Sequence, residues 1–189
     1  MRTLVYIRRS KQYNETVLNY AAKGVESDEI VTVSEYSNGQ LYIDMNSSTW
    51  DYCSKSSGFM ERELDLGKII FRDRLLRNTP YHEALILIRR AVGNCLKLFE
   101  TESFDSLVTY PVDNYIMDIL MEVAKKNGVK CYGVCNFFIS DYKRITLYGE
   151  HTPMRTPAKQ EVDAVIERIQ NNFRSHMAPN RKAALKAGV

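Results

Sequence analysis

The sequence predicts an α/β fold with a Rossmann-like open sheet that is mainly parallel and flanked by helices. The first observation behind this prediction is the alternation of β-prone apolar runs with amphipathic runs along the chain. The second is that some of these runs are apolar throughout, as in residues 4–7 and 129–134, which is typical of strands buried on both faces of a parallel sheet. Together they predict about four strands.

The N-terminal residues predict one strand–helix–strand unit. The run "TLVYI" at residues 3–7 is expected to be a strand, and "NETVLNYAAKG" a helix that begins at an Asn14 N-cap and ends at Gly24. Residues 29–35, "EIVTVSE", are expected to form the next strand. Because such units close right-handed over a sheet in nearly all cases, the two strands should run parallel.

Residues 36–102 predict a less regular region followed by a long helix. The Asn–Gly pair in "YSNGQLY" predicts a small hairpin, and the Ser-rich stretch after it a loop with a short helix around Trp50. Residues 81–102 are expected to form a helix that buries one apolar face. That face would consist of Leu85, Ile88, Val92, Cys95, Leu96 and Phe99.

The clearest strand–helix–strand unit lies in the run "SLVTYPVDNYIMDILMEVAKKNGVKCYGV". It predicts a strand at 107–110, a helix at 114–126, a stop at Asn127–Gly128 and a strand at 129–134. Near the C-terminus, residues 159–173 form a further amphipathic pattern.

The predicted domain boundary lies before that last helix. Residues 1–157 are expected to form the α/β domain, and residues 158–189 a helix and a basic tail.

Composition and missing motifs exclude several classes of function. The net charge is +3, and no run approaches the roughly 18 apolar residues that span a bilayer, so a cytoplasmic protein with at most peripheral membrane contact is expected. The four cysteines lack a CxxC spacing and a nearby histidine, which favours free thiols over a metal site. Glycine-rich dinucleotide, P-loop, GxSxG and HExxH motifs are missing, so no metal and no cofactor are expected. The basic tail lacks interleaved aromatic residues, so no nucleic-acid partner is expected.

Candidate ligand-binding residues follow the predicted strands. In open α/β sheets, ligands bind beyond the carboxyl ends of the strands, which points to Arg8, Arg9, Asp113, Asn114 and Asn136. Two interpretations of the pair Asp113–Asn114 stay open. Asp113 is the N-cap of the following helix, or one of the two residues hydrogen-bonds a sugar hydroxyl.

The cluster "FRDRLLR" also has two interpretations. Arginine forks suit phosphate or carboxylate ligands, which makes Arg72 and Arg74 candidates, but an ordinary helix surface with an Asp73–Arg77 ion pair would show the same pattern. As candidate catalytic groups we name His151, the histidine best placed for a general base, and Asp113.

Part of the chain resembles a known family. The run "LVTYPVDNYIMDILMEVAKKNGVKCYGV" followed by "RITLYGE", together with "IIFRDRLLR", is similar to the N-terminal part of bacterial surface or capsular polysaccharide biosynthesis proteins. These are glycosyltransferase-like proteins of two-Rossmann-domain (GT-B type) architecture. The resemblance spans residues 66–150 and, more loosely, 4–7. It adds Arg144 and Glu150 to the candidates for the binding cleft. The candidates Arg72, Arg74, Asp113 and Asn114 lie in the same matching segments.

The resemblance implies the acceptor-side domain of a glycosyltransferase-like protein in polysaccharide biosynthesis. The expected partners are a glycan acceptor or nucleotide sugar and a second glycosyltransferase domain or chain, without which catalysis is not expected. The alternative is a non-catalytic α/β module that binds a nucleotide, a glycan or a protein. A third hypothesis is a small self-sufficient enzyme with His151 as its base.

Overall fold

The computed structural model describes residues 1–46, 53–110, 112–136, 143–148, 152–153 and 156–176. Contacts divide the chain into one unit at Met1–Met154 and another at Arg155–Val189, and each is described by itself. The first unit contains β1 (Arg2–Tyr6), α1 (Lys11–Lys23), β2 (Glu29–Ser34), β3 (Leu41–Tyr42), α2 (Cys53–Glu63), α3 (Leu66–Arg72), α4 (Arg74–Arg77), α5 (Tyr81–Thr101), β4 (Ser106–Thr109), α6 (Tyr115–Lys126), β5 (Lys130–Asn136), β6 (Lys143–Leu147) and β7 (Thr152–Pro153). The second unit contains α7 (Lys159–His176).

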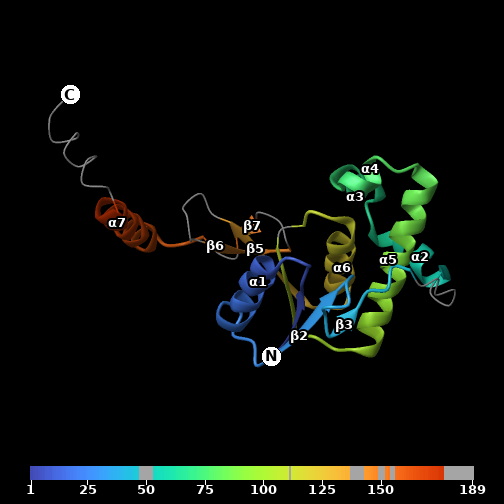
Figure 1. The fold of residues 1–189 in the computed structure, drawn as a ribbon, viewed down its shortest axis with the longest axis horizontal. Coiled ribbons are helices and arrows are strands. Elements are labelled where there is room, and N and C mark those ends of the chain that lie inside the picture. The colour runs from blue at the N-terminus through green and yellow to red at the C-terminus, as the bar shows by residue number, and fades with distance from the viewer. Residues whose placement is uncertain (47–52, 111, 137–142, 149–151, 154–155, 177–189) are drawn as a thin grey trace. The chain divides into compact units, whose positions relative to one another are not determined.

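The predicted α/β class is confirmed. Within the described residues the strands form one open sheet in the order β3-β2-β1-β4-β5-β6-β7 (Figure 1). The strands from β3 to β5 in this order pair in parallel, while β6 and β7 add an antiparallel edge. The order 3-2-1-4-5-6 is that of the doubly wound nucleotide-binding folds. The sheet thus has more strands than the sequence predicted.

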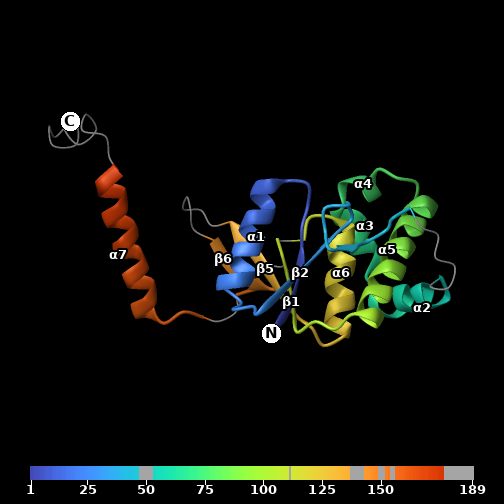
Figure 2. The same cartoon turned by 60° about the horizontal axis from the view of Figure 1, so that its bottom comes forward.

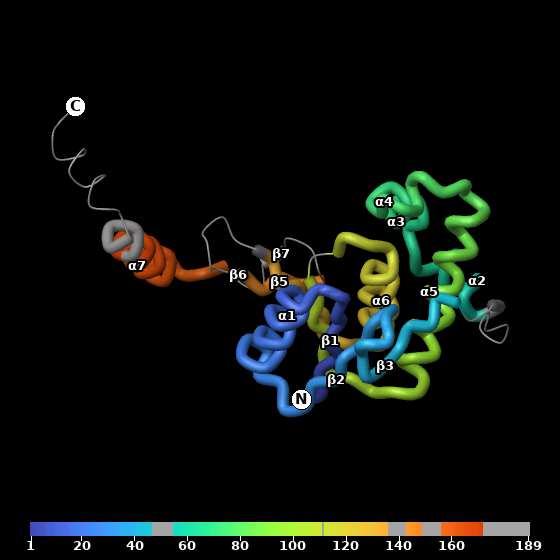
Figure 3. The backbone as a smooth tube through the Cα atoms, in the orientation of Figure 1, coloured from blue at the N-terminus to red at the C-terminus, as the bar shows by residue number. Residues whose placement is uncertain are grey.

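Alternate residues of the central strands bury themselves on opposite faces of the sheet. Leu4 and Leu107 join the cluster formed with α5 and α6, whereas Val5 and Val108 pack against Val17 of α1. Figures 2 and 3 show α1 on one side of the sheet and α5 with α6 on the other. Two-sided burial explains why these strands are apolar throughout.

The hairpin prediction at Asn38–Gly39 was wrong. Instead of turning back antiparallel, the chain loops beside the end of β2 and pairs parallel to it, with Val33 opposite Leu41. The amide of Gln40 donates to the Thr32 hydroxyl at 3.0 Å, and its side-chain oxygen accepts from the Thr32 amide at 2.8 Å. These bonds fix a loop that lies at the carboxyl end of β2.

The first helix starts earlier than predicted, so the Asn14 cap was wrong. Ser10 is the N-cap, and Asn14 lies one turn inside the helix. Its side chain accepts from the Arg8 amide at 2.8 Å and donates to the Arg8 carbonyl at 2.7 Å. An asparagine inside a helix thus holds the loop between β1 and α1. The predicted ends at Gly24 and at Asn127–Gly128 are confirmed, the latter with Gly128 at φ 73°.

Residues 53–101 form a helical segment between β3 and β4. The segment "FRDRLLR" is not one helix, because Asp73 has an extended backbone and separates α3 from α4. The expected Asp73–Arg77 ion pair was wrong, since this carboxylate accepts from the backbone amides of Leu75 and Leu76. The long helix α5 confirms its prediction, with Ile88, Val92 and Cys95 buried.

None of the helices in the described part of the chain is long and apolar enough to cross a membrane.

Candidate functional site

The carboxyl ends of β1 and β4 are adjacent in the sheet. Helix α1 connects β1 to β2 on one face of the sheet, and α6 connects β4 to β5 on the other face. The direction in which the chain adds strands to the sheet therefore reverses between β1 and β4. In doubly wound sheets this position is where ligands bind. Arg8 and Arg9 follow β1, and Asp113 and Asn114 follow β4, so all four predicted residues lie at this edge of the sheet, where Arg8 contacts Asp113.

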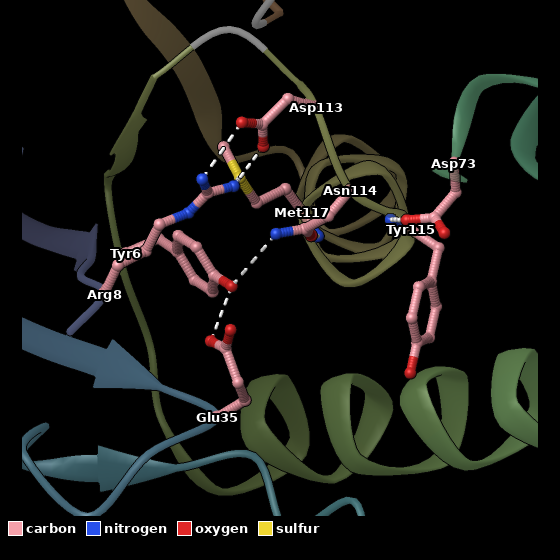
Figure 4. A network of polar contacts seen from close by, with 8 residues as sticks. All are labelled: Tyr6, Arg8, Glu35, Asp73, Asp113, Asn114, Tyr115 and Met117. Carbon is pink, nitrogen blue, oxygen red and sulfur yellow. Dashed lines mark hydrogen bonds and ion pairs between the residues drawn. The ribbon is translucent and has the colours of Figure 1, made fainter. Parts of the chain in front are cut away.

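Arg8 and Asp113 close this position with an ion pair. The Arg8 guanidinium donates to both carboxylate oxygens of Asp113, at 2.9 Å from Nη1 and with a shorter bond from Nη2. Burial has the largest single effect on the pKa of Arg8 and lowers it, but the bond to Asp113 and the charge interactions with Tyr13, Asp113 and Tyr6 together leave the pKa raised. Figure 4 shows the fork facing Asp113 beside the sulfur of Met117, which accepts a bond at 2.9 Å. The pair joins the ends of two neighbouring strands through both terminal nitrogens of the guanidinium, while the buried Nε of Arg8 has no hydrogen-bond partner among the described residues.

The N-cap of α6 is Asn114, so the prediction that Asp113 caps this helix was wrong. The Asn114 side-chain oxygen accepts from the Met117 amide at 2.8 Å. Its nitrogen lies 3.5 Å from the hydroxyl of Tyr6, and that hydroxyl donates to Glu35 at 2.5 Å (Figure 4). Burial, reinforced by Glu35, raises the pKa of Tyr6, so the phenol stays a donor and orients the Glu35 carboxylate.

An open hollow of about 580 Å³ lies one strand further along this edge, beyond β2 and β3. It is lined by Arg9, Glu35, Tyr36, Ser37, Asn38, Tyr42 and Asn46. Small-molecule sites typically measure about 300–1,000 Å³, so the hollow has the size of a ligand site.

The lining side chains are held in place by their neighbours. The Arg9 guanidinium lies over the Tyr36 ring, 4.3 Å from its centroid. Asn38 donates to the Arg8 carbonyl at 2.8 Å, and Glu35 is held by Tyr6. The hollow therefore presents one cation, one carboxylate, amides, a hydroxyl and two phenol rings, most of them on the loop after β2.

Asp73 reaches this edge from a distant part of the sequence. Its second carboxylate oxygen accepts from the Tyr115 amide at 2.9 Å, so Asp73 supplements Asn114 at the start of α6 (Figure 4). One buried carboxylate thereby caps α4 and α6 together. The backbone that carries Asp113 and Asn114 is fixed by this contact.

The predicted arginines Arg72 and Arg74 lie away from the hollow. Arg72 is 3.7 Å from Asp118 on α6, and Arg74 is exposed on α4. The contact of Arg72 with Asp118 fits the helix-surface interpretation of this cluster, and the ligand-binding interpretation stays a prediction.

Asp118 provides a test of that ion pair. Burial raises the pKa of its carboxyl, and Arg72 opposes the shift only in part. The native state therefore keeps the proton to higher pH than the unfolded chain, so the Asp118 contribution to stability falls as pH rises above 3.8. We expect Asp118→Asn to equal or exceed the original protein in stability at neutral pH, by up to about 1 kcal/mol.

Urea unfolding of both proteins at neutral pH and at pH near 3 measures this effect. The difference should vanish in acid, where the Asp118 carboxyl is neutral as well. A less stable Asp118→Asn protein at neutral pH would show instead that the contact with Arg72 outweighs the cost of burial.

The remaining candidates lie near β5 and β6 or beyond the described residues. Asn136 ends β5, and its side chain lies outside the description. Arg144 was expected after the last strand but lies within β6, opposite Cys135. Because β6 runs antiparallel, its start is still near the carboxyl end of β5. Glu150 and His151 fall outside the described residues.

Sequence reasoning missed the loop that lines most of the hollow. Glu35 and Tyr36 directly follow β2, so the rule that selected Arg8 after β1 applies equally to them. They were missed because the Asn–Gly signal predicted a hairpin there. In the described part of the chain, no group of three or more His, Cys, Asp or Glu residues is arranged to hold a metal ion.

No family model, no curated protein and no solved structure matches this chain.

Proposed function

We propose that this chain is the acceptor-side domain of a glycosyltransferase-like protein in surface polysaccharide biosynthesis, and that the hollow beyond β2 and β3 holds part of the glycan acceptor. The observation that carries the proposal is the lining of this hollow by phenol rings, amides, a hydroxyl and a carboxylate at the carboxyl edge of the sheet. The donor sugar and the reaction would need a second domain or chain.

The lining suits a sugar better than an apolar ligand. A sugar ring has apolar C–H faces and a rim of hydroxyls, so it needs aromatic surfaces and hydrogen-bonding groups together. Tyr36 and Tyr42 supply the first, and Ser37, Asn38 and Glu35 the second. Tyr6 fixes Glu35 before any ligand arrives, which lowers the ordering cost of binding.

Occupation of the neighbouring position by Arg8 and Asp113 also supports this choice. Because both terminal nitrogens of Arg8 already bond to Asp113, a neutral hydroxyl that bound them would have to displace a charge-assisted bond. The hollow requires no such displacement.

Titration of the chain with neutral and acidic oligosaccharides, nucleotides and nucleotide sugars, followed by thermal unfolding and calorimetry, tests the proposal. Glycans are expected to raise the melting temperature by mass action. Tyr36→Ala should weaken glycan binding about tenfold, because it removes an aromatic face and the support under Arg9.

The matched control is Tyr81→Ala, which removes an exposed tyrosine on α5 outside the hollow. It should leave glycan binding unchanged. Binding of nucleotide sugars without binding of glycans would contradict the acceptor role. Equal losses in Tyr36→Ala and Tyr81→Ala would show that glycans bind elsewhere.

A further inference from the structure

We propose that α3, α4 and the first residue of α5 form a surface that docks on an anionic lipid bilayer. This basic helical surface is defined by the exposed side chains of Lys68, Phe71, Arg72, Arg74, Leu75, Arg77 and Tyr81. The proposal goes beyond the proposed function and does not depend on it.

Large apolar side chains on this surface point to solvent. Phe71 is 72% exposed, Leu75 58% and Tyr81 63%, and they are among the most exposed large hydrophobic residues in the described part of the chain. Three such side chains within eleven residues are unlike the single apolar residues scattered over ordinary surfaces. Phenylalanine and leucine insert among acyl chains, and tyrosine favours the headgroup region.

The charge of the same segment complements an anionic surface. Residues 66–81 contain four lysines or arginines and one acid, a formal charge of +3, which equals that of the whole chain. The one acid, Asp73, is buried and caps backbone amides, so it is not presented to a partner. Arg72 is paired with Asp118, so the charge offered to a bilayer rests mainly on the exposed Arg74 and Arg77. Each basic residue near an anionic membrane adds to the attraction, and salt screens it.

The surface is held against the α/β domain. Asp73 binds the first amide of α6, and Arg72 contacts Asp118 one turn later. Figures 1 and 2 both show α3 and α4 beside the end of α6 that follows β4. Docking would therefore bring the carboxyl edge of the sheet towards the headgroups. That a lipid-carried acceptor would be presented there rests on the proposed function, whereas the docking does not.

A bilayer fits the combination of side chains better than nucleic acid does. Phosphates of nucleic acid would attract the arginines, but they offer no apolar partner for Leu75. Basic faces with exposed apolar residues are the pattern of helices that lie in the membrane interface.

Sedimentation of the full chain with lipid vesicles tests the proposal. We expect binding to phosphatidylcholine vesicles that contain about a third phosphatidylglycerol, little binding to pure phosphatidylcholine, and release at high salt. Phe71→Ser with Leu75→Ser, and separately Arg74→Glu with Arg77→Glu, should each weaken binding about tenfold or more. All four side chains are exposed, so thermal unfolding should remain close to that of the original chain.

Two double variants serve as matched controls. Val162→Ser with Ile166→Ser removes exposed apolar residues from α7, and Lys23→Glu with Lys130→Glu reverses the same charge elsewhere. Both should bind vesicles as the original chain does. Equal losses in the controls, equal binding to neutral vesicles, or salt-sensitive binding to duplex DNA without binding to vesicles would each overturn the proposal. None of these outcomes bears on glycan binding in the hollow, which is measured without vesicles.

Discussion

Replacing Asp73 with alanine is expected to lower the free energy of unfolding by about 3 kcal/mol, a large effect for one side chain. The carboxylate accepts from the amides of Leu75, Leu76 and Tyr115, and the latter two residues are buried. Alanine would leave these donors without a partner, and each buried unsatisfied group costs about 1–3 kcal/mol. Urea unfolding followed by circular dichroism measures the loss.

Two further variants separate the contributions. Asp73→Asn keeps one acceptor oxygen and should lose about half as much stability as alanine, because one of the two capped helix ends then meets an amide nitrogen. Asp65→Ala removes the exposed cap of α3, which accepts from the Lys68 amide alone, and should cost about 1 kcal/mol. If Asp73→Ala costs no more than Asp65→Ala, the link from α4 to α6 contributes little.

Gly39→Ala is expected to cost about 1–3 kcal/mol and to deform the hollow. A Cβ at Gly39 would lie 2.7 Å from the carbonyl oxygen of Leu41 and 3.0 Å from the amide nitrogen of Ser34. Both are backbone atoms, so the loop that carries Tyr36 and Asn38 would have to move. We expect lower thermal stability together with a loss of glycan binding.

The control is Gly67→Ala in α3. A Cβ there meets only the Asp65 side chain at an ordinary 3.5 Å, and alanine favours a helix by about 1 kcal/mol over glycine. Gly67→Ala should therefore be as stable as the original chain or more so, with glycan binding intact. If Gly39→Ala unfolds like the original chain and binds glycans equally well, then neither the close approach nor the loop geometry matters for the hollow.

Two neighbouring positions at the carboxyl edge of the sheet differ in what their side chains contact. At the junction of β1 and β4, the pairing of Arg8 with Asp113 fixes the ends of two strands. The adjacent loop after β2 then remains available, with Arg9 supported by Tyr36 on its border. Arg8 and Arg9 are neighbours in sequence but differ in role because successive residues leave a strand towards different sides.

Local sequence features predicted much of the fold. The apolar pattern predicted strands β1, β2, β4 and β5 and helices α5 and α6. The spacing of buried residues along the chain depends only on whether a segment is a helix or a strand, so it can be read without knowledge of the packing. The edge that carries the candidate site followed from the same elements, because ligands in open α/β sheets bind beyond the carboxyl ends of the strands.

What the sequence by itself determined is therefore the fold class, the strands and helices named above, and the edge of the sheet at which the candidate site lies. The tertiary structure decided which side chains meet there. Arg8 contacts Asp113 across 105 residues, and Asp73 binds the Tyr115 amide across 42. It also decided that residues after β2 pair in parallel rather than as a hairpin. Periodicity records which face of an element is buried, whereas these contacts depend on strand order and on the packing of helices distant in sequence, which no local pattern encodes.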